Sequence, residues 1–238
     1  MKAVGILLAL LSTTFGFGQS DLNTWAGLAI KTSLTKKIAL SLEGQTRFDQ
    51  HSTHLKTAFI SPELSYEFKN HFKVDGAYRL SSVPFDNSTS NRIYTHRYNV
   101  DASFRNILGL FIKKPVVNMS LRLRGTHERE SNKRNDNYVR ARIKAVYNIK
   151  KSNYKPHVSA ELFYHLRDQI EYTFTTVKTH HVITKFRVRF GVDYSLKKRQ
   201  KISLFGIYQK QLITLKNEFI LGARYAYKIS FKKKNPRH

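Results

Sequence analysis

Three side chains in segment 157–161 combine an imidazole, a hydroxyl and a carboxylate at a spacing of two residues. Residues two apart in an extended strand project from the same face, so His157, Ser159 and Glu161 would lie side by side. A hydroxyl beside an imidazole is the combination that hydrolases use as nucleophile and general base. One interpretation of this chain is therefore a hydrolase that uses His157 and Ser159.

The residues between them argue against that chemistry. Val158, Leu162 and Tyr164 belong to the opposite, apolar face of the same segment. Outer-membrane lipid hydrolases that carry a His-x-Ser pair on a barrel strand direct the pair outward to lipid, whereas here the apolar face would take the lipid side. We therefore expect His157 and Ser159 to form ordinary hydrogen bonds in the interior, and we predict that the protein is not an enzyme and has no catalytic residues.

Metal and cofactor motifs are lacking from the sequence. His180 and His181 are adjacent, and neighbours on a strand point to opposite faces, so they cannot bind one ion together. The chain contains no Cys, which excludes a disulfide framework, a lipoprotein anchor and a Cys-ligated metal. There is no P-loop, dinucleotide-binding glycine pattern or His-Glu zinc motif. We therefore predict no cofactor and no metal site.

The segments that must position these side chains alternate apolar with polar residues from Leu22 to Phe231. Segment 138–149 shows this best, because Val139, Ala141, Ile143 and Ala145 fall on one face of an extended strand. Its opposite face includes the following residues: Tyr138, Arg140, Arg142 and Lys144. One face suits lipid and the other suits water, which is the pattern of a membrane β-barrel.

Eleven such segments can be counted, at 22–34, 38–48, 56–68, 72–82, 92–105, 116–128, 137–149, 156–167, 180–194, 202–212 and 218–231. The fold class we predict is all-β: an antiparallel up-and-down transmembrane β-barrel of 10 to 12 strands. Bacterial barrels made of one chain usually have an even number of strands. We therefore expect one segment to be merged, missed or overcounted, either at 106–114 or in the stretch before Lys185.

The N-terminus has the layout of a secretory signal peptide. Lys2 precedes an apolar run at 3–11, and Gly16-Phe17-Gly18 provides a small-x-small cleavage signal. We predict a signal peptide at 1–18 and a barrel domain at 19–238 with a basic C-terminal tail. The sequence after residue 18 has no apolar run of about 18 residues, which excludes a helical span. The predicted location is the outer membrane of a Gram-negative-type bacterium.

The formal net charge is +26 and the pI is about 10.3. In a cytosolic chain this would point to nucleic acid. Here the cations occur in short turns and on polar strand faces, Arg47, Arg79 and Lys185 among them, so we expect no nucleic-acid partner. The basic turns would share a periplasmic rim and meet anionic lipid head groups. The predicted lumen-lining residues are Arg97, Arg122, Arg124, Arg140, Arg142, Lys144, Arg187, Arg189, Glu43, Asp101 and Glu161.

Alternation alone also fits a secreted soluble β-barrel binding protein, with its apolar face turned inward. The signal peptide, the long strands and aromatic residues toward strand ends favour the membrane. The aromatic residues assigned to these interfacial girdles are Trp25, Phe59, Tyr78, Tyr94, Tyr98, Tyr164, Tyr208 and Tyr227.

Four segments carry a resemblance to a known family. They are 21–28 (DLNTWAGL), 40–47 (LSLEGQTR), 94–102 (YTHRYNVDA) and 121–124 (LRLR). In this order, the segments resemble an uncharacterised family of exported, porin-like outer-membrane proteins classed as a domain of unknown function. The resemblance implies an outer-membrane β-barrel and no established activity or site.

The function we expect is a structural or porin-like role, with outer-membrane lipids as partners. Opposite charges inside a narrow barrel pair with one another, which predicts a largely salt-bridged lumen. The surplus of cations would make any narrow pore prefer small anions. The lipid hydrolase and the soluble binding protein are the alternatives left open.

Overall fold

The structure is a computed structural model that describes residues 22–49, 52–69, 71–85, 88–112, 115–130, 135–166, 171–173, 176–178 and 182–230. The predicted signal peptide at 1–18, the basic tail at 231–238 and the His180-His181 pair lie outside the described residues.

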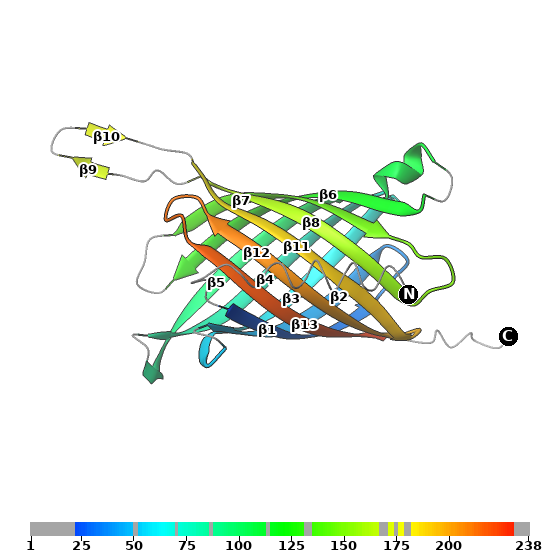
Figure 1. Ribbon diagram of the computed structural model, residues 1–238, viewed down its shortest axis with the longest axis horizontal. Coiled ribbons are helices and arrows are strands. Elements are labelled where there is room, and N and C mark those ends of the chain that lie inside the picture. Colours follow the sequence, from blue (N-terminus) through cyan, green and yellow to red (C-terminus); the bar gives the residue numbers. More distant parts are fainter. Residues whose placement is uncertain are drawn as a thin grey trace, which may run out of the picture.

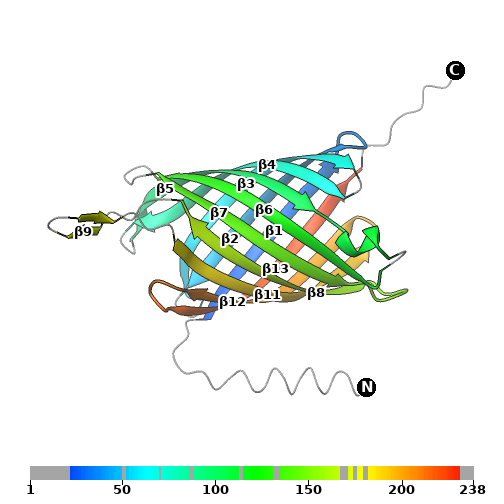
Figure 2. The same ribbon diagram turned by 90° about the horizontal axis from the view of Figure 1, so that it is seen from above.

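Eleven strands close into a barrel whose strands run obliquely around the wall (Figures 1 and 2). They are β1 (Leu22–Ser33), β2 (Ile38–Asp49), β3 (His54–Lys69), β4 (Phe72–Phe85), β5 (Ser88–Phe104), β6 (Val117–Glu130), β7 (Asp136–Tyr147), β8 (Tyr154–His165), β11 (Val182–Lys197), β12 (Gln200–Gln211) and β13 (Asn217–Ile229). The prediction of an all-β barrel with 10 to 12 strands is confirmed.

The closing pair differs from the others. Strands adjacent in the barrel wall pair antiparallel, except β1 and β13, which pair parallel from Leu22↔Phe219 to Thr32↔Ile229. An up-and-down chain with an odd number of strands ends in the direction in which it began, so its first and last strands can only pair parallel. The expectation that one of the eleven segments had been miscounted is therefore wrong.

Short elements occupy the two stretches in which sequence analysis expected a miscounted strand, 106–114 and the residues before Lys185. A 3-10 helix, η2 (Ile107–Leu110), follows Asn106, which has a left-handed backbone with φ of 53°. Asn is one of the residues that adopts this conformation readily. The stretch before Lys185 contains a hairpin outside the barrel, β9 (Glu171–Thr173) and β10 (Thr176–Lys178). Neither element adds a strand to the barrel.

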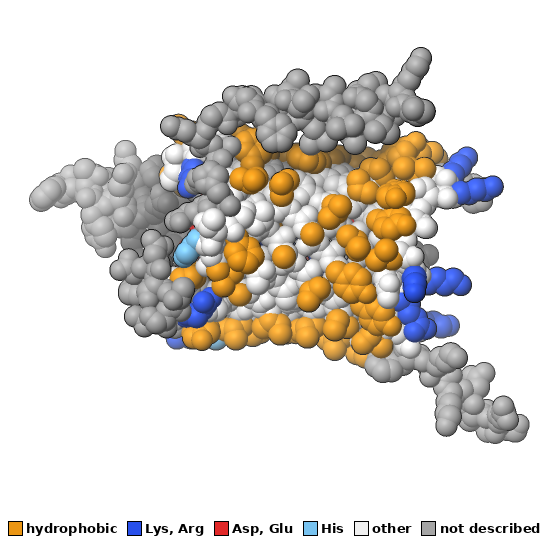
Figure 3. Space-filling view, turned by 60° about the horizontal axis from the view of Figure 1, so that its bottom comes forward, with side chains coloured by type: hydrophobic (Ala, Val, Ile, Leu, Met, Phe, Trp, Pro, Cys, Tyr) orange, Lys and Arg blue, Asp and Glu red, His pale blue; other side chains and the backbone are white. Residues whose placement is uncertain are grey.

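The connections fall at two ends of the molecule. The turn end carries the connections after β1, β3, β5, β7 and β11, and it includes η2. The loop end carries the connections after β2, β4, β6, β8 and β12, and the β9–β10 hairpin projects from it (Figure 1). Lys and Arg side chains gather at the turn end (Figure 3). Among the described residues, Lys36, Lys37, Lys150, Lys198 and Arg199 lie in its turns.

The outer wall is apolar. Leu28, Val100 and Ile143 are 66%, 63% and 46% exposed, and hydrophobic side chains cover much of the wall (Figure 3). Charged residues such as Asp101, which is 2% exposed, alternate with them and project inward. A soluble barrel requires the inverse arrangement, with a largely apolar interior. The wall therefore presents a surface suited to lipid.

Two of the predicted girdle residues face the other way. Trp25 lines the interior, and Phe59 is 7% exposed and contacts interior cations, so their assignment to an interfacial girdle is wrong. Both lie on the inward parity of their strands, in register with Arg47 and Ser81. Tyr94, Tyr98 and Tyr164 are on the outer wall, at 51%, 53% and 38% exposed. None of the helices within the described residues has the length and apolarity to cross a membrane.

Candidate functional site

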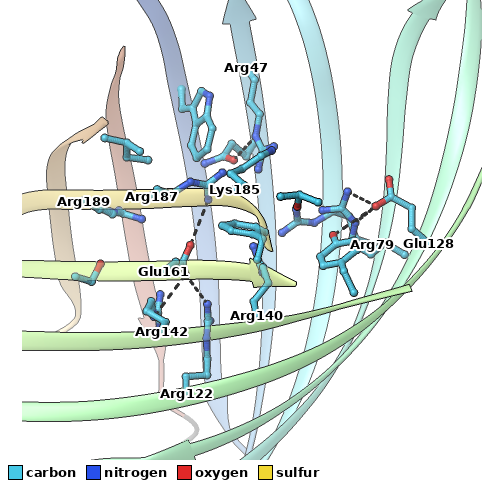
Figure 4. Close-up of a pocket in the computed structure, with 18 of the residues that line it drawn as sticks. Arg47, Arg79, Arg122, Glu128, Arg140, Arg142, Glu161, Lys185, Arg187 and Arg189 are labelled. Atoms are coloured by element: carbon cyan, nitrogen blue, oxygen red, sulfur yellow. Dashed lines mark hydrogen bonds and ion pairs between the residues drawn. The ribbon is translucent and has the colours of Figure 1, made fainter. Parts of the chain in front are cut away.

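The barrel encloses a cavity of about 340 Å³ whose lining is dominated by charge (Figure 4). Nine cations line it: Arg47, Arg79, Arg97, Arg122, Arg140, Arg142, Lys185, Arg187 and Arg189. Four carboxylates line it as well: Glu43, Glu128, Asp136 and Glu161. Strand alternation projects all of these side chains inward. The cavity wall therefore carries an excess of positive charge.

The structure brings most of the predicted lumen residues to this cavity. Eight of the eleven line it: Glu43, Arg97, Arg122, Arg140, Arg142, Glu161, Arg187 and Arg189. Asp101 and Arg124 also face inward, but they pair with each other beside the cavity. Lys144 shares the inward parity of Arg142 and stands opposite Ser159 on β8.

Sequence reasoning missed part of the aromatic lining. Tyr138 was placed on the polar face of its segment and does line the cavity, but Trp25 and Phe163 line it as well. The signal for Phe163 was available, because it lies two residues from Glu161 and therefore shares its face. The same signal was available for Phe59, which shares its face with Ser61 and Glu63.

Glu161 is the centre of a salt-bridged cluster. This carboxylate is 7% exposed and lies 3.1 Å from the Arg122 guanidinium, 3.4 Å from that of Arg187 and 3.7 Å from that of Arg142. Arg142 and Arg187 stand directly opposite Glu161 on the two neighbouring strands. One negative charge is thus shared among three cations, and most of the positive charge remains.

Two more carboxylates hold cations on the same side of the barrel. Asp101 accepts hydrogen bonds from Arg124 and lies 3.5 Å from Arg122. Glu128 lies 2.6 Å from the nearest nitrogen of Arg97. The Asp101 and Glu161 contacts share Arg122 and so form one ion-pair network across β5, β6, β7, β8 and β11, beside the separate Arg97–Glu128 pair.

Arginines face arginines at three cross-strand positions, one between β4 and β5 and two between β6 and β7. Arg79 stands opposite Arg97, Arg122 opposite Arg142, and Arg124 opposite Arg140. Like charges directly opposite one another destabilise a sheet. Carboxylates contact several of these residues, but Arg79 and Arg140 form no ion pair within the described part of the chain.

Aromatic rings, in place of carboxylates, hold the remaining cations. The guanidinium carbon of Arg79 lies 3.7 Å from the centre of the Phe59 ring, and that of Arg189 lies 3.6 Å from the centre of the Phe205 ring. The Arg140 guanidinium lies 5.1 Å from the centre of the Phe163 ring. The Nε atoms of Arg79, Arg140 and Arg189 are buried without a hydrogen-bond acceptor. A ring attracts a cation without cancelling its charge, so these guanidiniums keep both their charge and free donors.

The ring beneath Arg189 depends on a glycine. Phe205 stands opposite Gly222, and a Cβ at that glycine would lie 2.2 Å from Cζ of the ring. Any larger residue at 222 would therefore displace Phe205. The Phe205 ring also packs with Ile207, Ile220 and Trp25 in a small apolar cluster inside the barrel.

His157 and Ser159 lie inside the barrel, at 8% and 6% exposed, while Val158 between them is 49% exposed on the outer wall. Nδ1 of His157 has no hydrogen-bond partner. The pair is thus turned away from the lipid-facing surface where a barrel hydrolase would need it. Among the described residues there is no group of His, Asp and Glu arranged to hold a metal ion.

The sequence matches, over residues 22–219, the model of a family described as protein of unknown function (DUF2490). The chain belongs to this family. The predicted resemblance to an uncharacterised porin-like family is thereby confirmed. The comparison with curated proteins finds no match.

Two solved structures similar to this chain are porins by title. A structure titled KdgM porin is 16% identical, with a TM-score of 0.42, and the match covers 76% of this chain and 81% of that one. The anion-selective porin from Comamonas acidovorans is 11% identical, with a TM-score of 0.35 over 79% of this chain. The match spans 52% of the length of that porin.

Proposed function

We propose that this protein is an outer-membrane β-barrel with a porin-like role, whose narrow lumen accepts small anions in preference to cations. The observation that carries the proposal is the charge of the cavity wall, with nine cations against four carboxylates. Fixed Arg and Lys charge in a pore lowers the electrostatic barrier for anions and raises it for cations.

Salt bridges occupy only part of the lumen in this proposal. Glu161, Asp101 and Glu128 pair with cations on β5, β6, β7 and β11. Arg79, Arg140 and Arg189 contact aromatic rings and form no ion pair within the described residues. The network therefore narrows the lumen without neutralising it.

The surface of the barrel supports a membrane location. Exposed apolar residues cover the wall, and the described turns at one end are rich in Lys. Cationic residues beside a bilayer attract anionic head groups. Outer-membrane lipids are the partners we propose, with the turn end in the periplasm. The inward burial of His157 and Ser159 gives no support to the hydrolase alternative, and we propose a non-enzymatic role.

The test is planar-bilayer recording of the refolded protein in a KCl gradient. We expect discrete openings whose reversal potential favours chloride. The double variant Arg140→Gln/Arg189→Gln should shift the reversal potential toward zero, because it removes two cavity charges that no carboxylate compensates.

The matched control is Lys150→Gln/Lys151→Gln, which removes two charges from an exposed connection at the turn end. Its reversal potential should stay close to that of the parent protein. Openings that favour potassium, or a silent bilayer after insertion has been verified, would contradict the proposed anion passage.

A further inference from the structure

We infer that the lumen contains a binding site for a small oxyanion that carries two or more negative charges. The site consists of five cations joined by three aromatic rings, which we call the cation belt: Arg79, Arg47, Arg187, Lys185 and Arg140 with Phe59, Trp25 and Phe163. The inference rests on the proposed function, because it identifies the class of anion that this lumen would hold.

The belt is continuous, since neighbouring cations share a ring. Arg79 and Arg47 lie 3.7 and 5.0 Å from the centre of the Phe59 ring. Arg47 and Arg187 lie 4.2 and 5.5 Å from the centre of the Trp25 ring. Phe163 continues the belt, with Arg187 at 5.0 Å, Arg140 at 5.1 Å and Lys185 at 5.5 Å from its centre.

The belt passes around the cavity rather than along one wall. Its cations come from β4, β2, β11 and β7, and Figure 4 shows them around a common space. Two cations that share a ring each lie within 5.5 Å of its centre, so they are no more than about 11 Å apart. This is close to the distance of about 10 Å at which salt screens charges in solution. Neighbouring cations therefore repel one another, and a ligand with several negative groups relieves more than one repulsion at once.

The contacts of the belt leave hydrogen-bond donors available. A guanidinium that stacks on a ring keeps its N–H groups in the plane of the cation, where a carboxylate or phosphate can accept two of them. The Nε atoms of Arg79 and Arg140 are buried and have no acceptor. A buried charged donor without a partner is costly, which points to an acceptor that the protein itself does not supply.

The volume of the cavity and the donor geometry of its guanidinium groups limit the kind of ligand that fits. A cavity of about 340 Å³ is at the lower end of small-molecule sites, which begin at about 300 Å³. Oxyanions match the paired donors of a guanidinium, whereas chloride offers a single centre without fixed geometry. Phosphates and polycarboxylates share the required chemistry, so pyrophosphate and citrate are the probes.

Trp25 provides a direct readout, because it is the single tryptophan of the chain and contacts two belt cations. The experiment titrates the refolded full chain in detergent with pyrophosphate or citrate and follows Trp25 fluorescence. Sodium chloride holds the ionic strength constant. We expect a saturable change with either probe, and no comparable change when chloride alone replaces an inert buffer anion.

The variant Arg47→Gln should weaken pyrophosphate binding by about tenfold or more, because it removes charge-assisted hydrogen bonds to the ligand. Arg47→Lys keeps the charge and loses the paired donors, so it should retain part of the affinity and shows whether a loss reflects misfolding. Arg105→Gln is the control, because Arg105 pairs with Glu67 and does not line the cavity. Its affinity should be unchanged.

The outcomes separate this inference from the proposed function. A barrel that is anion-selective in bilayers but binds pyrophosphate and citrate no better than chloride overturns the site and leaves the porin-like role. Equal affinities for Arg47→Gln and Arg105→Gln also overturn it. If the barrel binds pyrophosphate saturably but shows no openings in bilayers, the binding site is supported and the proposed anion passage is contradicted.

Discussion

At the scale of single residues, Glu161 has the largest share of the lumen's charge compensation. Three arginines lie within 3.7 Å of its carboxylate, which is 7% exposed. Removing one partner of a buried ion pair costs about 3 to 5 kcal/mol, because the other charge stays buried without compensation. Glu161→Gln should therefore lower the free energy of unfolding by about 3 kcal/mol. Urea titration of Trp25 fluorescence would measure it.

Glu67→Gln is the matched control for that variant. Glu67 lies 2.6 Å from Arg105, but both side chains are about 40% exposed. Exposed ion pairs contribute about 0 to 1 kcal/mol to stability, so the free energy of unfolding of this variant should be close to that of the parent protein. If Glu161→Gln and Glu67→Gln lower the free energy of unfolding by similar amounts, Glu161 has no special role in the stability of the barrel.

The glycine opposite Phe205 provides a second residue-scale prediction. Gly222→Val should force the Phe205 ring away from Arg189, because a Cβ would lie 2.2 Å from the ring. We expect a loss of stability and a change in the fluorescence of Trp25, whose ring contacts Phe205 edge to face. Gly76→Val is the control, since a Cβ at Gly76 meets nothing within 4 Å. Equal effects of the two substitutions would contradict the argument.

The direction of single side chains could be predicted from the sequence, but their partners could not. Two-residue alternation places Arg140 and Arg142 on the inward face without any knowledge of the fold. That Glu161 contacts Arg122 depends on which strands are neighbours and on their register. Trp25 was assigned to the membrane interface from its residue type, whereas its parity places it with the interior residues.

At the scale of elements, β7 offers a test of the two faces of the wall. Ile143 is 46% exposed on the outer wall, whereas Val146 has the inward parity of Arg142 and stands opposite His157. A charge facing the middle of a bilayer costs a barrel about 2 to 4 kcal/mol. In lipid vesicles, Ile143→Lys should therefore lose about that much stability, and Val146→Lys should lose clearly less. A larger loss for Val146→Lys would mean that the faces are inverted.

Barrel strands are well predicted because the alternation of apolar and polar residues is repeated along each of them. The ranges 38–48 and 202–212 differ from β2 and β12 by at most two residues at either end. The β9–β10 hairpin lacks such a signal, since its strands have three residues each and pair only with one another. The predicted boundary is least accurate where a strand continues beyond the wall of the barrel. The strand predicted at 92–105, for example, is β5, which begins at Ser88.

At the scale of the whole molecule, the basic turn end predicts an orientation. The parent chain has no Cys, so single cysteines can be labelled without background. Lys198 lies in a connection of the turn end and Thr214 in one of the loop end. With the turn end in the periplasm, a membrane-impermeant maleimide should label Thr214→Cys on intact cells and leave Lys198→Cys unlabelled. The reverse pattern would assign the basic rim to the cell exterior.

The architecture as a whole was predictable, apart from its closure. Alternation and strand length indicate a barrel, and the count of eleven was available from the same pattern. The expectation of one miscounted segment came from the usual even strand number of bacterial barrels and not from the sequence of this chain. No local pattern in β1 or β13 distinguishes a parallel neighbour from an antiparallel one, because both faces of each strand alternate in the same way.

The parallel seam between β1 and β13 has a consequence for assembly. The chain runs from one end of the barrel to the other an odd number of times, so Leu22 and Ile229 lie at opposite ends of the barrel. In a bilayer they would face different compartments, whichever way the barrel is inserted. Successive hairpins can complete every other pair, but this pair joins strands from the two extremes of the chain. Such non-local pairing forms slowly. We therefore expect the seam to be the last contact made, and the unpaired edges of β1 and β13 to be the most vulnerable part of the folding intermediate.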